Sequence, residues 1–217
     1  MNSDLKSELD LIKLNRSFYS KNAVRLSKDL LGKYLVHSFD GKELVGKIVE
    51  VEAYMGIGDK AAHSYKGRRT ARTEVMYGEE GHAYIYLIYG MYHCLNVVAA
   101  KEGIAQAVLV RALEPIKGVD IMADNRYGKA LGELKKGQIT NITNGPGKLC
   151  RAFNITKVYN GEDLTGNRLF ICENRNSKEE FDIVETKRIG IDYAEEAKFF
   201  PWRFYIKDNP YISVKEK

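Results

Sequence analysis

The clearest pattern of hydrophobic and polar positions lies near the middle of the chain. Residues 83–88 alternate with a period of two, which predicts a β-strand with Tyr84 and Tyr86 on one face. Residues 92–99 predict a second strand, and Gly90-Met91 between them predicts a two-residue hairpin turn. The pattern therefore predicts a β-hairpin with Tyr89 and Tyr92 beside its tip.

Two interpretations of this tyrosine-rich hairpin are open. In the first, the rings form part of a sheet core and their phenols are hydrogen-bonded. In the second, the tip is an aromatic wedge and the strand is a stacking platform for nucleic acid. Large aromatic groups at an exposed tip are unusual on a soluble surface unless they have a partner, but this stretch alone leaves both interpretations open.

The remaining pattern predicts short strands and short helices. Strands are predicted at 33–39, 44–54, 107–113 (ended by Pro115), 168–172, 187–191 and 204–206, with a tight turn at Asp40-Gly41 between the first two. Helices are predicted at 22–31 (capped by Asn22 and stopped by Gly32), 117–126, 146–153 and 193–198. Strands joined by hairpins with helices outside them predict an α+β fold around a curved, mainly antiparallel sheet.

Composition is compatible with one domain. The chain has 217 residues, 44% of them hydrophobic, which is enough for a single core. We predict a polar N-terminal arm, loose or a weakly held helix, over residues 1–20 and one domain over residues 21–217. The net charge of +5 permits a polyanionic partner without requiring one.

The cysteines and the N-terminus predict the compartment. Cys94, Cys150 and Cys172 are far apart and lack the spacing of a disulfide framework or a zinc site, so we predict reduced thiols and no metal. The first residues lack the apolar core of a signal peptide, and no run is long enough for a membrane span. We therefore predict an intracellular protein of the cytoplasm, or of the nucleoid in a bacterium, with no membrane contact.

One predicted strand carries two carboxylates. Alternation over residues 47–54 places Ile48, Glu50, Glu52 and Tyr54 on one face, and Lys47 on the other. The simplest interpretation is a solvated strand face. The alternative is a working carboxylate, because an aromatic residue completes this face and the next segment supplies His63 and a basic cluster that includes Arg68 and Arg72.

Arg111 is the only charged residue between Ala107 and Leu113. An unpaired charge in a buried strand is prohibitive, so we expect a carboxylate partner. The pair is either a structural bridge or an arginine that keeps a working carboxylate ionised.

Together these residues resemble the alkyladenine (3-methyladenine) DNA glycosylase family, whose members excise damaged bases. The resemblance is carried by the blocks VEVEAY with AAHS, YIYLIYGMYHCLN, VLVRALEP, NGPGKLC, RIGI and RFYIKDNPYIS, spread in the same order over residues 22–213. It implies that the fold is a partly open barrel with peripheral helices and a protruding hairpin that inserts into DNA.

The resemblance also implies roles for particular residues. Glu52 matches the general base that activates a water, and Arg111 and the main-chain carbonyl of Ile189 match groups that hold this water. The base-binding positions implied are Tyr54, Ala61, Ala62, His63, Tyr86 and Asn96, with the rings stacking on the base, the His63 N–H donating to its edge and Asn96 excluding guanine. The DNA-binding positions implied are Tyr89, Met91, Arg68, Thr70, Arg72 and Lys148, with Tyr89 entering the duplex.

The implied function is a monofunctional glycosylase that flips damaged purines out of double-stranded DNA and hydrolyses the N-glycosidic bond. The implied substrates are 3-methyladenine, 7-methylguanine, hypoxanthine and ethenoadenine, with no cofactor, no required protein partner and a monomeric enzyme. Lys47, the amine nearest to Glu52 in sequence, is predicted on the opposite strand face, which favours hydrolysis without lyase activity. The alternatives are a non-catalytic binder of distorted DNA or RNA, which would not need Glu52 or Arg111, and an enzyme acting on free nucleosides.

Overall fold

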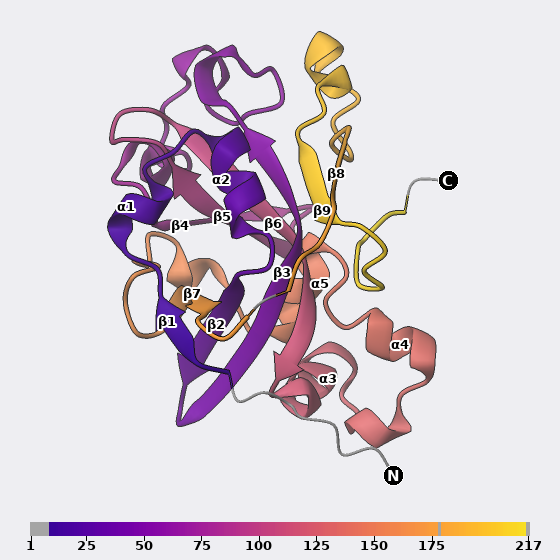
Figure 1. The fold of residues 1–217 in the computed structure, drawn as a ribbon. Helices are drawn as coiled ribbons and strands as arrows, with labels where there is room; N and C mark the ends of the chain where they lie inside the picture. The colour runs from indigo at the N-terminus through magenta and orange to yellow at the C-terminus, as the bar shows by residue number, and fades with distance from the viewer. Residues whose placement is uncertain (1–8, 178, 216–217) are drawn as a thin grey trace.

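The computed structural model describes residues 9–177 and 179–215 as an α+β fold built on one curved antiparallel sheet (Figure 1). The strands follow the spatial order β1-β7-β2-β3-β6-β5-β4, and β9 and β8 extend the sheet from β3. No pairing joins β1 to β4 within the described ranges, so the sheet stays open. The predicted fold class is confirmed.

Nine strands and five α-helices make up this part of the chain. The strands are β1 Leu11–Lys13, β2 Tyr34–Phe39, β3 Lys42–Tyr54, β4 Ala83–Ile88, β5 Tyr92–Ala99, β6 Gln106–Lys117, β7 Leu169–Asn174, β8 Ile183–Thr186 and β9 Arg203–Ile206. The α-helices are α1 Arg16–Tyr19, α2 Ala23–Leu30, α3 Val119–Tyr127, α4 Lys136–Thr140 and α5 Pro146–Ala152. Short 3₁₀ helices lie at Gly56–Gly58, Tyr65–Gly67, Glu74–Tyr77, Leu131–Glu133, Lys157–Tyr159 and Glu195–Phe199.

The local signals for α2 and for the first hairpin act as predicted. The Asn22 side chain accepts a hydrogen bond from the Arg25 N–H and caps α2, and Gly32 follows its end with a φ of 78°. Asp40 and Gly41, both with positive φ, form the two-residue turn between β2 and β3.

Strand β3 organises the sheet, because it pairs with three other strands. Its first half pairs with β2, its second half pairs with β9 along the same edge, and β6 follows its other edge (Figure 1). The register with β6 shifts on both sides of Glu50, which marks a β-bulge. This bulge bends the strand where its two carboxylates lie.

Because of the bulge, two side chains of β3 lie on the opposite face of the strand from the one predicted by alternation. Ile48 packs in the main core together with Val49 and Val51, instead of sharing a face with Glu50. Lys47 pairs across β2 with Tyr34, which lies in the separate cluster on the other side of the sheet. Strict alternation failed here because the extra residue of a bulge exchanges the two faces.

The second hairpin has a longer turn than predicted. Ile88 pairs with Tyr92, so the turn contains three residues, Tyr89, Gly90 and Met91. Tyr89 and Gly90 both have positive φ, at 52° and 70°. A third residue in the turn places the Tyr89 ring at the tip, where 83% of this residue is exposed.

Two other strand predictions are wrong, and part of the predicted N-terminal arm is ordered. Pro115 does not end β6, which continues to Lys117; it lies opposite Gly46 beside a register shift, where a residue without an N–H is tolerated. Residues 187–191 form a loop, and the strand of this region is β8, just before it. β1 pairs with β7 and Tyr19 is fully buried, so the described part of the predicted N-terminal arm joins the fold, and residues 1–8 lie outside the described ranges.

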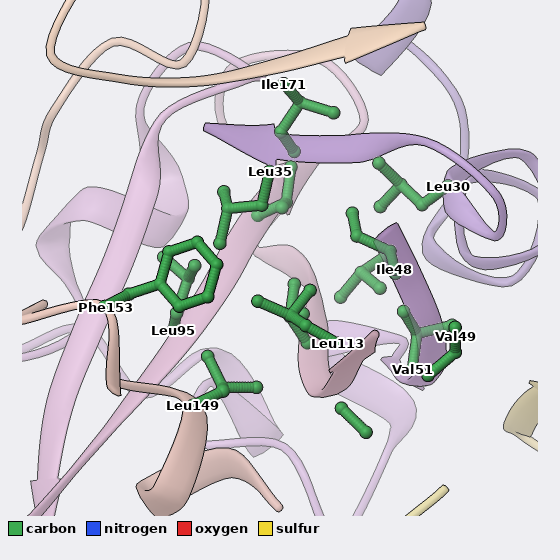
Figure 2. Close-up of a cluster of buried hydrophobic side chains, with 14 of the residues drawn as sticks. Leu30, Leu35, Ile48, Val49, Val51, Leu95, Leu113, Leu149, Phe153 and Ile171 are labelled. Carbon is green, nitrogen blue, oxygen red and sulfur yellow. The ribbon is translucent and has the colours of Figure 1, made fainter. Parts of the chain in front are cut away.

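The main hydrophobic core lies between the sheet and its helices (Figure 2). Leu149 in the middle of α5 and Phe153 just after its end approach Leu95 and Leu113 of the sheet, and Leu30 of α2 packs on the same core. This packing leaves the opposite face of β3, β6, β5 and β4 free to line a cavity. No helix in the described ranges is long and apolar enough to span a membrane.

Candidate active site

A cavity of about 340 Å³ opens between the hairpin, the end of β3 and the loop at residues 189–193. Its volume is within the range of ligand pockets. Nine of the predicted site residues line it: Tyr54, Ala61, His63, Arg72, Tyr86, Tyr89, Asn96, Arg111 and Ile189. These residues come from five separate regions of the chain, so the fold brings them together.

Glu52 lies directly behind the cavity wall and is fully buried. Its Oε1 accepts hydrogen bonds from the Ile189 N–H at 2.8 Å and pairs with Arg111 Nη1 at 3.2 Å. Its Oε2 accepts a hydrogen bond from the Tyr54 hydroxyl at 2.9 Å. Within the described ranges three donors reach Glu52, one fewer than an ionised carboxylate can accept, so it keeps capacity to accept from a water.

Glu50 is buried on the same side of β3, so the solvated strand face is excluded. Arg111 joins the two carboxylates, because its Nε donates to Glu50 Oε1 at 2.9 Å. The predicted carboxylate partner of Arg111 is therefore confirmed, and Glu50 is a second one. Burial alone would lower the pKa of Arg111, but the charges of Glu52 and Glu50 outweigh it and raise this pKa.

Aromatic rings surround the space in front of Glu52. Burial, and then the charge of Glu52, raise the pKa of Tyr54 well above its usual value, and burial raises the pKa of Tyr86, so both phenols are neutral. His63 contacts the Tyr86 ring edge-on with centroids 4.7 Å apart, and its Nδ1 lies 2.9 Å from the Tyr84 hydroxyl. Neutral rings that frame a cavity suit the π face of a planar ligand.

His63 is held as a neutral imidazole. Burial lowers its pKa to about 4, and the positive charges of Arg72 and Arg68 act in the same direction. The imidazole therefore stays uncharged at neutral pH, and it is both a hydrogen-bonded structural group and part of the cavity wall.

Asn96 holds the hairpin and lines the cavity at the same time. Its Nδ2 donates to the carbonyl oxygens of Tyr84 at 3.0 Å and Cys94 at 3.4 Å. Satisfying backbone groups of the hairpin is thus part of its role.

The other predicted positions lie outside this cavity. Ala62 is buried beside it, Arg68 and Thr70 are exposed on the segment before Arg72, and Met91 is exposed at the hairpin tip. Lys148 Nζ donates to Asn141 and Asn144, and burial followed by the charge of Arg126 lowers its pKa.

Sequence reasoning missed the ion pair that anchors the cavity loop. Arg188 and Asp59 are both fully buried and form a bidentate pair with contacts of 2.5 and 2.8 Å. The Arg188 guanidinium also lies 4.8 Å from the Tyr54 ring centroid, so it supports that ring from one side. Arg188 belongs to the RIGI motif and Asp59 lies two residues before AAHS, but their separation of 129 positions gave no signal that they meet.

Tyr193 and Leu109 also line the cavity without having been singled out, and so does Tyr84, which the sequence placed on the same strand face as Tyr86. Tyr193 is 69% exposed at the rim. No group of three or more His, Cys, Asp or Glu side chains suited to bind a metal ion occurs within residues 9–177 and 179–215.

Comparison with known proteins gives one consistent result. The family model described as methylpurine-DNA glycosylase matches residues 17–210. A protein of Alkaliphilus oremlandii is 57% identical over 204 residues, covering 94% of this chain and 100% of its own length. Proteins of Clostridium novyi (58% over 203 residues, covering 94% and 99%) and Bacillus cytotoxicus (57% over 199 residues, covering 90% and 97%) are similar. All three carry the name "Putative 3-methyladenine DNA glycosylase".

Proposed function

The chain belongs to the methylpurine-DNA glycosylase family, and from this membership we propose that it excises damaged purines from double-stranded DNA by hydrolysing the N-glycosidic bond. The observation that carries the proposal is the buried Glu52 carboxylate, held by Arg111, Tyr54 and the Ile189 N–H behind a ring-lined cavity. The substrate class is 3-methyladenine, 7-methylguanine, hypoxanthine and ethenoadenine. The enzyme acts as a monomer in the cytoplasm or nucleoid.

The first step is extrusion of the damaged nucleotide. A base inside a duplex is out of reach of a buried carboxylate, so it has to leave the stack. Tyr89 at the hairpin tip enters the duplex and fills the gap that the nucleotide leaves. Five further residues contact the DNA around this gap: Arg68, Thr70, Arg72, Lys148 and Met91.

The extruded base then stacks between Tyr54 on one side and Tyr86 with His63 on the other. Ala61 and Ala62 border this space, and the His63 N–H donates to the edge of the base. Burial keeps the phenols of Tyr54 and Tyr86 neutral, and Arg188 packs against the Tyr54 ring and holds it in place.

Hydrolysis needs one carboxylate and one water. Glu52 accepts a proton from the water while the water oxygen attacks the anomeric carbon. The N-glycosidic bond breaks, and its electron pair leaves with the base. Arg111 pairs with Glu52 and, with the carbonyl of Ile189, holds the water. Donation of the Ile189 N–H to Glu52 holds the residue that carries this carbonyl beside the carboxylate.

The enzyme is monofunctional in this mechanism. A lyase reaction needs an amine nucleophile at the anomeric carbon. The bulge returns Lys47 to the side of the sheet that carries Glu52, which corrects the prediction from alternation. Its ammonium group, however, pairs with Glu114 at 3.1 Å and Glu179 at 2.9 Å, away from the cavity lining.

The function is tested with a duplex that carries one hypoxanthine. Incubation should release the free base and leave a strand that breaks only on alkali treatment, and the undamaged duplex should remain intact. A protein that binds the hypoxanthine duplex in preference to the undamaged one but leaves no abasic site would be a binder of distorted DNA instead.

Loss of the Tyr89 ring should weaken capture of the flipped nucleotide. The Tyr89→Ala variant leaves the gap in the stack unfilled, which costs a few kcal/mol per unstacked step. Fluorescence of ethenoadenine in a duplex reports the stacked fraction, which should rise in Tyr89→Ala and stay close to wild type in Tyr89→Phe. An equal flipping equilibrium in all three proteins would contradict the role of Tyr89.

Asn96 should control discrimination against guanine. Stacking accepts any purine by its faces, so selection has to come from the edges, and an Asn96 side chain set against the 2-amino group excludes guanine by obstruction. Asn96→Ala should raise excision of mismatched guanine relative to hypoxanthine by about 10-fold.

The control for Asn96 is Asn160→Ala. Asn160 accepts a hydrogen bond from the Ile85 N–H and supports the same hairpin without lining the cavity. If Asn160→Ala changes the ratio equally, or if Asn96→Ala lowers excision of both bases together, Asn96 is only a structural support.

A further inference from the structure

The side chain next to the proposed general base is saturated with donors. Glu50 Oε1 accepts from Arg111 Nε at 2.9 Å, Arg203 Nε at 2.8 Å and Ser213 Oγ at 2.8 Å, and its Oε2 accepts from the Ser213 N–H at 2.5 Å. Glu50 is fully buried and does not line the cavity. With four donors and no contact with the cavity, Glu50 does not reach the substrate, so its effect acts through its partners.

Two of these donors come from the C-terminal segment. Ser213 donates to Glu50 from both its backbone and its side chain, and its Oγ also accepts from Arg111 Nη2 at 3.3 Å. Arg203 donates to Glu50 and to the Val214 carbonyl, so it ties the same segment from β9. The chain end is thus fastened to the ion network of the cavity, although it lies 102 positions from Arg111 in sequence.

Arg111 is shared between two carboxylates that compete for it. Its Nε faces Glu50 and its Nη1 faces Glu52. Ser213 and Arg203 donate hydrogen bonds that compensate the charge of the Glu50 carboxylate. Glu50 then attracts Arg111 less strongly, and the guanidinium can keep its contact with Glu52. Without Ser213, the unsatisfied Glu50 carboxylate would draw the guanidinium toward itself, because an uncompensated buried charge is strongly unfavourable.

We infer that Ser213, Glu50 and Arg203 are positioning residues, and that the segment 211–214 is a latch that sets Arg111 against Glu52. This inference rests on the proposed function for its effect on excision, but not for its effect on Arg111. A latch of this kind makes the C-terminal segment necessary for the rate of base removal and not for binding of the lesion.

The test compares chains that end at Ile212 and at Lys215, together with Ser213→Ala and Ser213→Thr. The chain ending at Ile212 loses both Ser213 donors and the Val214 carbonyl, whereas the chain ending at Lys215 keeps the latch. With enzyme in excess, the excision rate at saturation should fall by about 10- to 100-fold in the chain ending at Ile212 and less in Ser213→Ala. Affinity for the lesion duplex should stay within about 3-fold, and Ser213→Thr should restore the rate because threonine keeps the hydroxyl.

A second readout does not depend on excision. The Arg111 Nη1 hydrogens face Glu52, and their exchange should become at least about 10-fold faster in the chain ending at Ile212, because the guanidinium then moves toward Glu50. Unchanged hydrogen exchange at Arg111 overturns the latch, whatever the excision activity. An excision rate that falls only in proportion to DNA affinity or to the folded fraction overturns it too. The wild-type protein could excise no base while the hydrogen exchange of Arg111 still responds as expected. In that case the latch stands and the proposed function fails.

Discussion

The Glu52→Gln variant is expected to bind a lesion duplex as the wild type does and to excise its base about 10²- to 10⁴-fold more slowly. The amide keeps the shape of the side chain and can still accept the Tyr54 or Ile189 hydrogen bond, but it cannot take a proton from water. Single-turnover rates on a hypoxanthine duplex, with binding measured separately, give both quantities.

The matched control is Glu43→Gln on the same strand. Glu43 pairs with Lys117 near the start of β3 and does not line the cavity, so its loss should leave excision within about 2-fold of wild type. If Glu52→Gln excises as fast as Glu43→Gln, Glu52 is not the base and the proposed mechanism is wrong.

The Asp59→Asn variant is expected to lower the free energy of unfolding by about 3–5 kcal/mol, because it leaves Arg188 charged and buried without its partner. For a domain of this size the loss corresponds to a fall in melting temperature of roughly 6 to 20 °C. The excision rate should fall as well, because Arg188 immediately precedes Ile189, whose N–H donates to Glu52.

Asp182→Asn is the control for this pair. Asp182 and Lys207 are exposed and 3.7 Å apart, so their separation should cost less than about 1 kcal/mol. A double variant, Asp59→Leu with Arg188→Met, should be more stable than Asp59→Asn, because it removes both charges. Equal melting temperatures for Asp59→Asn and Asp182→Asn would contradict the importance of the buried pair.

Local signals in the sequence predicted much of the fold. Each of these signals depends on a few neighbouring residues: the Asn22 cap, the Asp40-Gly41 turn and the alternation of the hairpin strands. The pairing of Arg111 with a carboxylate could be predicted too, because a charge inside an apolar strand requires a partner.

Other features depend on contacts that local pattern does not encode. The bulge at Glu50 exchanges the faces of β3, so alternation misplaced Ile48 and Lys47. The Arg188–Asp59 pair and the Ser213 contact with Glu50 join positions more than a hundred residues apart. β1 and β8 were missed because they are only three and four residues long and lie in polar stretches of the sequence.

The central claim is that water, activated at Glu52, replaces the base on the anomeric carbon. It is tested most directly by running the wild-type reaction on a hypoxanthine duplex in water labelled with heavy oxygen and analysing the DNA by mass spectrometry, with borohydride added to a parallel sample. We predict free hypoxanthine, an intact strand whose abasic site carries one heavy oxygen after immediate reduction, and no enzyme–DNA adduct. A borohydride-trapped adduct on an enzyme amine, with strand cleavage, would contradict hydrolysis by water.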